Sequence, residues 1–204
     1  MRKVIVSEFM TLDGVVQAPG GADEDRDGAF EHGGWQMPYF DDVFGQTVIV
    51  GMAEAGGFLL GRRTYEIFAA YWPTAPEEER AVAAPLNDLP KYVASTTLTE
   101  PLAWQNSTLI EGDVAEGVAA LKRASGKDIH VIGSGELVQT LMQHDLVDEY
   151  RLMIHPIVVG GGKRLFRDGG ARMPLRLVDS RISSTGVVLA TYEPAEAEQV
   201  ASSL

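Results

Sequence analysis

Residues 59–68, LLGRRTYEIF, carry the pattern that decides the fold class of this chain. The apolar run 58–60 is typical of a short buried strand, and Gly61 permits the tight turn that follows it. Tyr65 and Phe68 then recur at helical spacing, which predicts a helix directly after the turn. A strand that runs through a turn into a helix is the repeating unit of layered α/β sheets.

A second unit of the same kind spans residues 130–141, HVIGSGELVQTL. Residues 128–133 are predicted to form a strand, and Ser134 is expected to cap the next helix. The apolar face of that helix consists of Leu137, Val138, Leu141 and Met142. Strands that alternate with helices in this way favour a sheet whose central strands run parallel.

The rest of the chain extends this alternation in both directions. Further strands are predicted over 3–10, 91–95 and 149–159, further helices over 40–55 and 113–122, and loops over 17–36 and 73–85. The run 48–50 would also suit a strand, but the helical spacing around it favours the helix. Residues 175–183 and 187–192 flank a Ser-Thr-Gly turn, which predicts a terminal hairpin. The predicted fold class is α/β, with a mostly parallel central sheet and an antiparallel C-terminal hairpin.

The composition limits the classes of partner. The 204 residues include 29 acidic and 17 basic side chains, for a formal net charge of −12, and no cysteine. The acidity argues against nucleic acid and anionic membranes as partners. Without cysteine there is no disulfide framework, thiolate metal site or cysteine nucleophile. The apolar run at the start, in MRKVIVSEFM, is too short for a signal or membrane segment, so a cytoplasmic protein is expected.

Three predicted strand ends carry residues that suit an anionic ligand. In a parallel sheet, ligands bind beyond the carboxyl ends of the strands, where loops enter helices. Residues 61–64 combine a glycine, two arginines and a helix start, residues 95–97 supply hydroxyls, and residues 133–136 form a Gly-Ser-Gly turn before a helix. Each turn also has a purely structural alternative: solvated arginines, a capped turn and closely packed glycines, respectively.

The histidines and serines form no recognised metal-binding or nucleophile motif. The four histidines show neither HxH nor HExxH spacing: His32, His130, His144 and His155. The chain also lacks the GxSxG sequence of a nucleophile elbow. No metal site is therefore predicted, and any redox chemistry would belong to a bound cofactor.

Six strings follow one another along the chain: SEFMTLDGVV, LLGRRTYEIF, KYVAST, HVIGSGELVQTL, LVDEYRLMIHPIVVGGGKRLF and the final hairpin. In this order they resemble the dihydrofolate reductase superfamily, and most closely the branch with the C-terminal domain of the bacterial riboflavin-biosynthesis reductase (RibD C-terminal-like). The resemblance implies a three-layer dihydrofolate-reductase-like domain over residues 1–193, followed by a flexible tail over 194–204. It also implies NADPH as hydride donor and a homodimer, for which the long strand 149–159 is one candidate surface.

The resemblance assigns the three strand-end turns to the cofactor. The implied cofactor residues are Gly61, Arg62, Arg63, Thr64, Ser95, Thr96, Ile132, Gly133, Ser134, Gly135, Glu136 and Leu137. An arginine suits the 2′-phosphate of NADPH because its planar guanidinium binds oxyanions through two hydrogen bonds. The related reductases have a Gly-Gly pair where this chain has Gly133-Ser134, a departure that concerns the local backbone geometry.

On the substrate side, the resemblance implies a carboxylate that helps to protonate the substrate. Residues 37–39, Met-Pro-Tyr, resemble the Met-Pro-Trp start of the segment that carries it, and Asp41 follows as the candidate. Asp13, beside the first loop, is the alternative acid. Candidates for stacking on a flat heterocycle or contacting a phosphate are Trp35, Tyr39, Phe40, Lys163 and Arg164. Each candidate also has a structural alternative. Asp41 would only start a helix and Asp13 would only form a turn, while the aromatic residues would belong to the core and the basic residues to a solvated face.

These assignments predict an NADPH-dependent oxidoreductase. It would transfer a hydride to a C=N or C=O carbon of a pteridine- or ribosylaminopyrimidine-like small molecule. The resemblance implies a reaction like that of 5-amino-6-(5-phosphoribosylamino)uracil reductase in riboflavin biosynthesis. The alternative is a non-catalytic homologue that binds a nucleotide or another ligand without turning it over.

Overall fold

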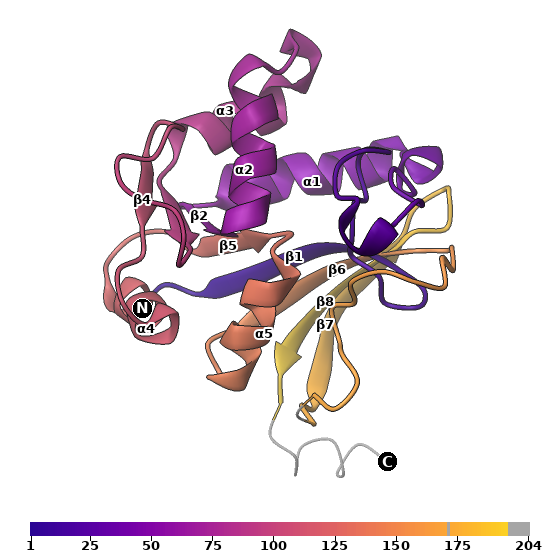
Figure 1. Ribbon diagram of the computed structural model, residues 1–204. Helices are drawn as coiled ribbons and strands as arrows, with labels where there is room; N and C mark the ends of the chain where they lie inside the picture. The colour runs from indigo at the N-terminus through magenta and orange to yellow at the C-terminus, as the bar shows by residue number, and fades with distance from the viewer. Residues whose placement is uncertain (171, 196–204) are drawn as a thin grey trace. The chain divides into compact units, whose positions relative to one another are not determined.

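The computed structural model describes residues 1–170 and 172–195, and it has the predicted α/β fold (Figure 1). The chain divides into two compact units. The first unit consists of Met1–Ile5 and Gly45–Leu146, and the second consists of Val6–Phe44 and the chain from Val147 onward. Each unit therefore contains two chain segments, and strand β1 (Val4–Thr11) begins in the first unit and continues in the second.

The first unit is built on a parallel sheet with the strand order β4-β3-β2-β5. Its strands are β2 (Phe58–Gly61), β3 (Lys91–Ala94), β4 (Ser107–Leu109) and β5 (Ile129–Ile132). The three neighbouring pairs are all parallel, and Gly61 lies opposite Ala94 in the register. The start of β1 adjoins β5, since the backbone N–H of Ile129 donates to the carbonyl of Lys3 over 2.9 Å.

Helices cover both faces of this sheet, which gives the first unit three layers. The helices are α1 (Asp42–Glu54), α2 (Arg62–Tyr71), α3 (Arg80–Asp88), α4 (Val114–Arg123) and α5 (Gly135–Gln143). In Figure 1, α2 and α3 lie on one side of β2 and β5, and α4 and α5 lie on the other. Phe58 and Leu60 of β2 pack with apolar residues of α1, α2 and α3, whereas Leu59 points to the opposite face because side chains alternate along a strand.

The second unit contains the antiparallel part of the fold. Its strands are β1, β6 (Glu149–His155), β7 (Leu175–Ile182) and β8 (Val188–Pro194), in the order β1-β6-β8-β7. Both β6–β8 and β8–β7 are antiparallel, and the register of β7 shifts between Leu177 and Asp179. These pairs confirm the predicted C-terminal hairpin. A small core of Val15, Ala18, Phe30 and Trp35 supports the long first loop of this unit.

Several boundaries differ from the sequence-based expectation. The stretch 73–85 was expected to be a loop with a short helical turn, but α3 begins at Arg80 and contains Pro85, because Ala83 and Leu86 bury an apolar face there. The strand expected over 149–159 ends at His155. The run 48–50 is helical, as expected, because it lies inside α1. Strand β4 has only three half-exposed or exposed residues and carries no apolar run that would reveal it.

The domain prediction stays a prediction. Strand β8 extends to Pro194, one residue past the predicted domain end at 193, and residues 196–204 of the predicted tail lie outside the described residues. Within the described part of the chain, no helix has both the length and the apolar content that crossing a membrane requires.

Candidate cofactor and substrate site

Three turns meet along one edge of the parallel sheet in the first unit. Strand β2 ends at Gly61, β3 at Ala94 and β5 at Ile132, and each turn follows directly. Because the strands are parallel neighbours in the order β3-β2-β5, their carboxyl ends lie at the same edge. All twelve predicted cofactor residues therefore belong to this edge of the first unit.

A side-chain hydrogen bond joins the turn after β2 to the turn after β5. The backbone N–H of Gly61 donates to Oγ of Ser134 over 2.9 Å. A Cβ added to Gly133 would lie 3.3 Å from Cγ2 of Thr64, tighter than an ordinary contact, so only glycine fits without a shift. Gly61, Thr64, Gly133 and Ser134 thus form a closely packed group, which we call the turn clamp.

Ser134 adopts a left-handed backbone conformation that usually favours glycine. Gly133 has φ +59°, and Ser134 has φ +63° and ψ +39°, so both lie in the left-handed region. The Gly133-Ser134 departure therefore preserves a backbone that a Gly-Gly pair would adopt. The prediction that the Ser134 side chain caps α5 is wrong, because its hydroxyl bonds Gly61 and the carbonyl of Ile132 instead of the helix.

The start of α2 is the more basic of the two helix N-termini at this edge. Neither α2 nor α5 has a side-chain cap, and α5 carries Glu136 in its first turn whereas α2 has no acid there. Nη1 of Arg62 lies 2.9 Å from Glu66 Oε2, as an exposed ion pair one helical turn apart. Such surface pairs contribute little free energy, so a phosphate can displace the carboxylate.

The predicted hydroxyl pair after β3 divides into a turn residue and an exposed residue. Oγ of Ser95 accepts hydrogen bonds from the N–H groups of Thr97 and Leu98 over 3.1 Å and 3.0 Å, which is the capped-turn alternative. The side chain of Thr96 is exposed beside it.

Asp41 is held as a helix cap in the second unit. Its Oδ1 accepts the N–H of Phe44 over 2.8 Å, and its Oδ2 accepts the hydroxyl of Ser184 over 2.7 Å and the N–H of Thr185 over 3.3 Å. The hydrogen bond from Phe44, followed by that from Ser184, lowers the pKa of Asp41 to about 2. A carboxyl with that pKa holds no proton near neutral pH, which weighs against Asp41 as proton donor.

Asp13 links the first loop to the segment after β6. Its carboxylate accepts hydrogen bonds from the hydroxyl of Thr11 over 2.6 Å and from the N–H of Gly160 over 2.9 Å. Burial raises the pKa of Asp13, but these hydrogen bonds and one from Val159 together lower it below its ordinary value. Asp13 also faces Arg164, whose Nε donates to the Asp13 carbonyl over 2.8 Å.

The basic residues predicted to contact a substrate phosphate are already paired. Nζ of Lys163 lies 2.8 Å from Asp25 and 2.9 Å from Asp27, and Nη2 of Arg164 lies 3.6 Å from Asp13. These pairs tie the first loop to the Gly-rich segment that precedes Lys163. Their charges are neutralised within the second unit.

The three predicted aromatic residues differ in exposure. The indole N–H of Trp35 donates to the carbonyl of Gln17, and the buried ring packs edge-on against His155 at 5.1 Å between centroids. Tyr39 also faces His155, at 5.9 Å. Phe40 is 58% exposed and therefore remains accessible to a ligand in the second unit.

Two buried ionisable residues of the second unit were missed from the sequence. Glu8 of β1 is 2% exposed, its Oε1 has no hydrogen-bond partner, and burial raises its pKa well above the usual range. His155 is fully buried, and burial lowers its pKa although a bond between Nδ1 and the Met153 carbonyl opposes the shift. An acid inside the apolar run VIVSEFM was the available signal for Glu8.

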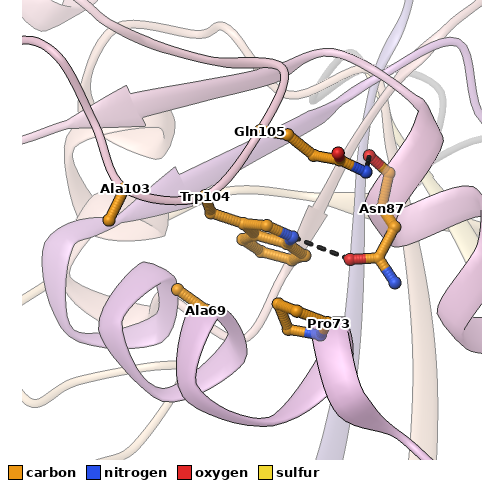
Figure 2. Close-up of a pocket in the computed structure, with 6 residues that line it drawn as sticks. All are labelled: Ala69, Pro73, Asn87, Ala103, Trp104 and Gln105. Carbon is orange, nitrogen blue, oxygen red and sulfur yellow. Dashed lines mark hydrogen bonds between the residues drawn. The ribbon is translucent and has the colours of Figure 1, made fainter.

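A pocket of about 390 Å³ opens in the first unit, at the other edge of the sheet (Figure 2). It is lined by Ala69, Pro73, Asn87, Ala103, Trp104 and Gln105. These residues adjoin the amino end of β3, where the N–H of Lys91 donates to the carbonyl of Asn106. The pocket is therefore separate from the turn clamp. Within the described residues, no three His, Asp or Glu side chains gather as a metal site would require.

Comparison with known proteins assigns the family. Residues 2–189 match the model of the RibD C-terminal domain. The chain belongs to the RibD C-terminal domain family. It is 32% identical over 193 residues to the uncharacterized protein YyaP of Bacillus subtilis (strain 168), with 94% of each chain covered.

Solved structures with the same fold include one cofactor-bound enzyme. A Shewanella sp. PV-4 protein provisionally assigned to riboflavin biosynthesis matches with a TM-score of 0.66 and 21% identity, over 95% of this chain and 99% of the other. Dihydrofolate reductase from Enterococcus faecalis, complexed with NADP(H), matches with a TM-score of 0.58 and 13% identity, over 95% and 97%. These matches confirm the dihydrofolate-reductase-like fold.

Proposed function

We propose that this protein is an NADPH-dependent reductase of a flat, heterocyclic small molecule. Membership of the RibD C-terminal domain family supports a reductase, and the related Enterococcus fold carries NADP(H). The observation that supports the cofactor most directly is the turn clamp, which holds two uncapped helix starts at the carboxyl edge of one parallel sheet. Helix starts at such an edge favour phosphate groups.

The residues at this edge fit a dinucleotide phosphate. Arg62 and Arg63 at the start of α2 would meet phosphate, and Thr96 offers an exposed hydroxyl beside them in the strand order. Gly133 lets the turn after β5 approach closely, because a side chain there would press on Thr64. A bound nicotinamide cofactor would supply the hydride, and the protein supplies binding, orientation and exclusion of water.

The proton for the reduced substrate comes, in this proposal, from ordered water. Asp41 and Asp13 accept several hydrogen bonds each, and both have a lowered pKa. A group that is ionised at neutral pH can orient a water molecule but has no proton of its own to give. The hydrogen bonds that the two aspartates accept favour this route over proton donation by Asp41 or by Asp13.

The substrate in this proposal carries no phosphate recognised by Lys163 or Arg164. Both cations are paired with aspartates, so a phosphoribosyl group would have to break those pairs. A pteridine-like substrate needs a flat apolar contact instead, which the exposed ring of Phe40 offers. The ribosylaminopyrimidine of riboflavin biosynthesis stays in the substrate panel as the competing candidate.

The second candidate function is a non-catalytic ligand-binding homologue. It is favoured by the same two aspartates, since neither is protonated at neutral pH. NADPH binding without turnover of pteridines, ribosylaminopyrimidines or quinones would support this candidate. Efficient turnover of any of them would rule it out.

The first test is NADPH binding followed by cofactor fluorescence. Replacing Arg62 and Arg63 with alanine should weaken binding about tenfold or more, because each charged hydrogen bond to phosphate contributes about 1.5–3 kcal/mol. Arg80→Ala is the matched control, since Arg80 forms a similar exposed pair with Glu77 elsewhere in the first unit. No binding at millimolar NADPH would contradict the proposal, as would equal binding by all three proteins. The predicted homodimer and the cytoplasmic location remain predictions.

A further inference from the structure

The pocket of the first unit has walls that are fixed by hydrogen bonds (Figure 2). Its volume of about 390 Å³ falls within the range of about 300–1,000 Å³ that is typical of small-molecule sites. The indole N–H of Trp104 donates to Oδ1 of Asn87 over 2.8 Å, and the backbone N–H of Trp104 donates to the hydroxyl of Tyr65 over 2.9 Å. Nδ2 of Asn87 in turn donates to the carbonyl of Trp72 over 2.9 Å. Because these bonds exist before a ligand arrives, binding would order few side chains.

The pocket has an apolar side and a polar side. Ala69 and Ala103 lie toward one side of the indole, whereas Asn87 and Gln105 adjoin each other beside its N–H group (Figure 2). Pro73 adds a further apolar surface. Gln105 is exposed, and its Nε2 donates to the carbonyl of Asn87 over 3.2 Å. A side-chain amide nitrogen has two hydrogens, so the second N–H of Gln105 can donate to a ligand.

A buried positive charge lies next to the indole. The ammonium group of Lys91 lies 4.5 Å from the centroid of the Trp104 ring, and the lysine side chain is fully buried. Its three protons are donated to uncharged carbonyl groups, those of Leu86, Asn87 and Leu89. These bonds leave the positive charge in place, and water screens a buried charge only weakly. An anion in the adjoining pocket is therefore favoured over a neutral molecule of the same shape.

We propose that this pocket binds an aromatic carboxylate. The ring contacts the apolar side, and the carboxylate accepts the free N–H of Gln105, where it keeps part of its hydration. A flat ring suits the apolar side because it is rigid and loses little entropy on binding. The reductase proposal concerns the carboxyl ends of the strands, whereas this pocket adjoins the amino end of β3, so each proposal can fail alone.

Two probes of the same shape test the charge. 2-Naphthoate and 2-naphthamide differ in the charged group, and the indole N–H resonance of Trp104 reports their binding by NMR. Its loss in Trp104→Phe assigns that resonance. The carboxylate should shift it with a dissociation constant of about 1 mM or tighter, as expected for a ligand of this size. The amide should bind about tenfold more weakly or worse.

Three substitutions test the location. Ala103→Phe fills the pocket and should weaken naphthoate binding about tenfold or more, whereas Ala120→Phe, at an exposed position of α4, should leave it unchanged. Gln105→Leu removes the free donor and should weaken binding about fivefold. Lys91→Met should remove the preference for the carboxylate over the amide. If this last variant does not fold, the two probes still test the charge in the wild-type protein.

Four results would overturn the proposal. They are an unshifted indole resonance at about ten times the expected dissociation constant, equal affinity for the two probes, unchanged binding in Ala103→Phe, and displacement of naphthoate by NADPH. The last result would place the probe at the cofactor edge instead of the pocket. Circular dichroism of each variant verifies that it is folded.

Discussion

Ser134 combines an unfavourable backbone with a favourable side-chain contact. A left-handed conformation costs a residue other than glycine about 1–2 kcal/mol. The hydroxyl compensates, because it accepts the N–H of Gly61 and so joins the turns after β2 and β5. Both effects belong to one residue, and substitutions can separate them.

Ser134→Gly and Ser134→Ala should differ in stability and agree in cofactor binding. Alanine keeps the backbone cost and loses the hydrogen bond, so it should be about 1 kcal/mol less stable than glycine in urea unfolding. Both variants lose the link to Gly61, and their NADPH affinity should fall about fivefold, the equivalent of one hydrogen bond. Unchanged affinity in both variants would show that the turn clamp does not position the cofactor.

Glu8 is the most unusual ionisable group of the second unit. Its side chain is buried, Oε1 lacks a partner, and the pKa is raised well above the ordinary value. The folded protein therefore retains a proton that the unfolded chain releases above a pH of about 4.3. In that range the folded state binds more protons, so this residue lowers stability as the pH rises.

Glu8→Gln should remove this pH dependence. Below pH 4 the variant and the wild type should unfold at similar urea concentrations, since both side chains are neutral there. As the pH rises toward 7, the advantage of the variant should grow by up to about 1.4 kcal/mol per pH unit. A constant difference across this range would contradict a raised pKa for Glu8. Glu78→Gln, at an exposed position, is the control for the measurement.

At the scale of elements, the end of α3 depends on one buried lysine. Nζ of Lys91, the first residue of β3, donates to the carbonyls of Leu86, Asn87 and Leu89 over 2.8 Å, 3.2 Å and 3.0 Å. It also lies 4.5 Å from the ring centroid of Trp104. Burial lowers the pKa of Lys91 to about 8, so the ammonium form still predominates at neutral pH. One side chain thus satisfies carbonyls that the helix end leaves open.

Lys91→Met should destabilise the protein by about 2–4 kcal/mol, because the carbonyls of Leu86, Asn87 and Leu89 lose a charged donor while the apolar stem is retained. The measurement is urea unfolding at pH 7. Lys122→Met is the matched control: the Lys122 ammonium donates to the carbonyl of Leu146 from a partly exposed position, and its loss should cost less. Equal effects of the two substitutions would contradict the special role of Lys91.

At the scale of the whole molecule, the two units share a strand rather than a linker. β1 contributes Val4 and Ile5 to the first unit and the rest of its length to the second. Each unit is also assembled from two separate chain segments. Neither unit can therefore be cut out as one continuous piece. The single domain over residues 1–193 remains a prediction.

Urea unfolding should consequently follow one cooperative transition. The tryptophans allow this to be measured in each unit, because Trp35 belongs to the second unit and Trp72 and Trp104 belong to the first. In Trp35→Phe, only the two tryptophans of the first unit fluoresce. In the Trp72→Phe/Trp104→Phe variant, only Trp35 of the second unit fluoresces. Each variant should give a fluorescence midpoint that coincides with its own circular dichroism midpoint. Separate midpoints would indicate two independently stable domains.

The sequence predicted the elements that have a strong local signal. The strand-turn-helix units at Gly61 and Ser134, the helix over 113–122 and the terminal hairpin were all expected, and the structure confirms them. The errors fall where the local signal is weak or misleading. Pro85 hid α3, because a proline in a helix is tolerated when the apolar residues beside it are buried.

The candidate site divides in the same way. The turns proposed to bind a cofactor could be predicted from the sequence, because glycine and basic residues at strand ends are local features. The pairing of the charged candidates could not be predicted in this way, because their partners lie far along the chain. Asp41 is tied to Ser184 and Lys163 to Asp25, each at a sequence separation of more than 130 residues.

By itself, the sequence determined the fold class and predicted the edge of the sheet where we propose that a cofactor binds, because both follow from periodicity and turn chemistry within short windows. Only the tertiary structure decided which ionisable groups are paired with another side chain and which are buried. It paired Asp13 with Arg164 and buried Glu8 without a partner for Oε1. Burial and pairing set the charge of a side chain, and both arise from contacts between segments that no local pattern records.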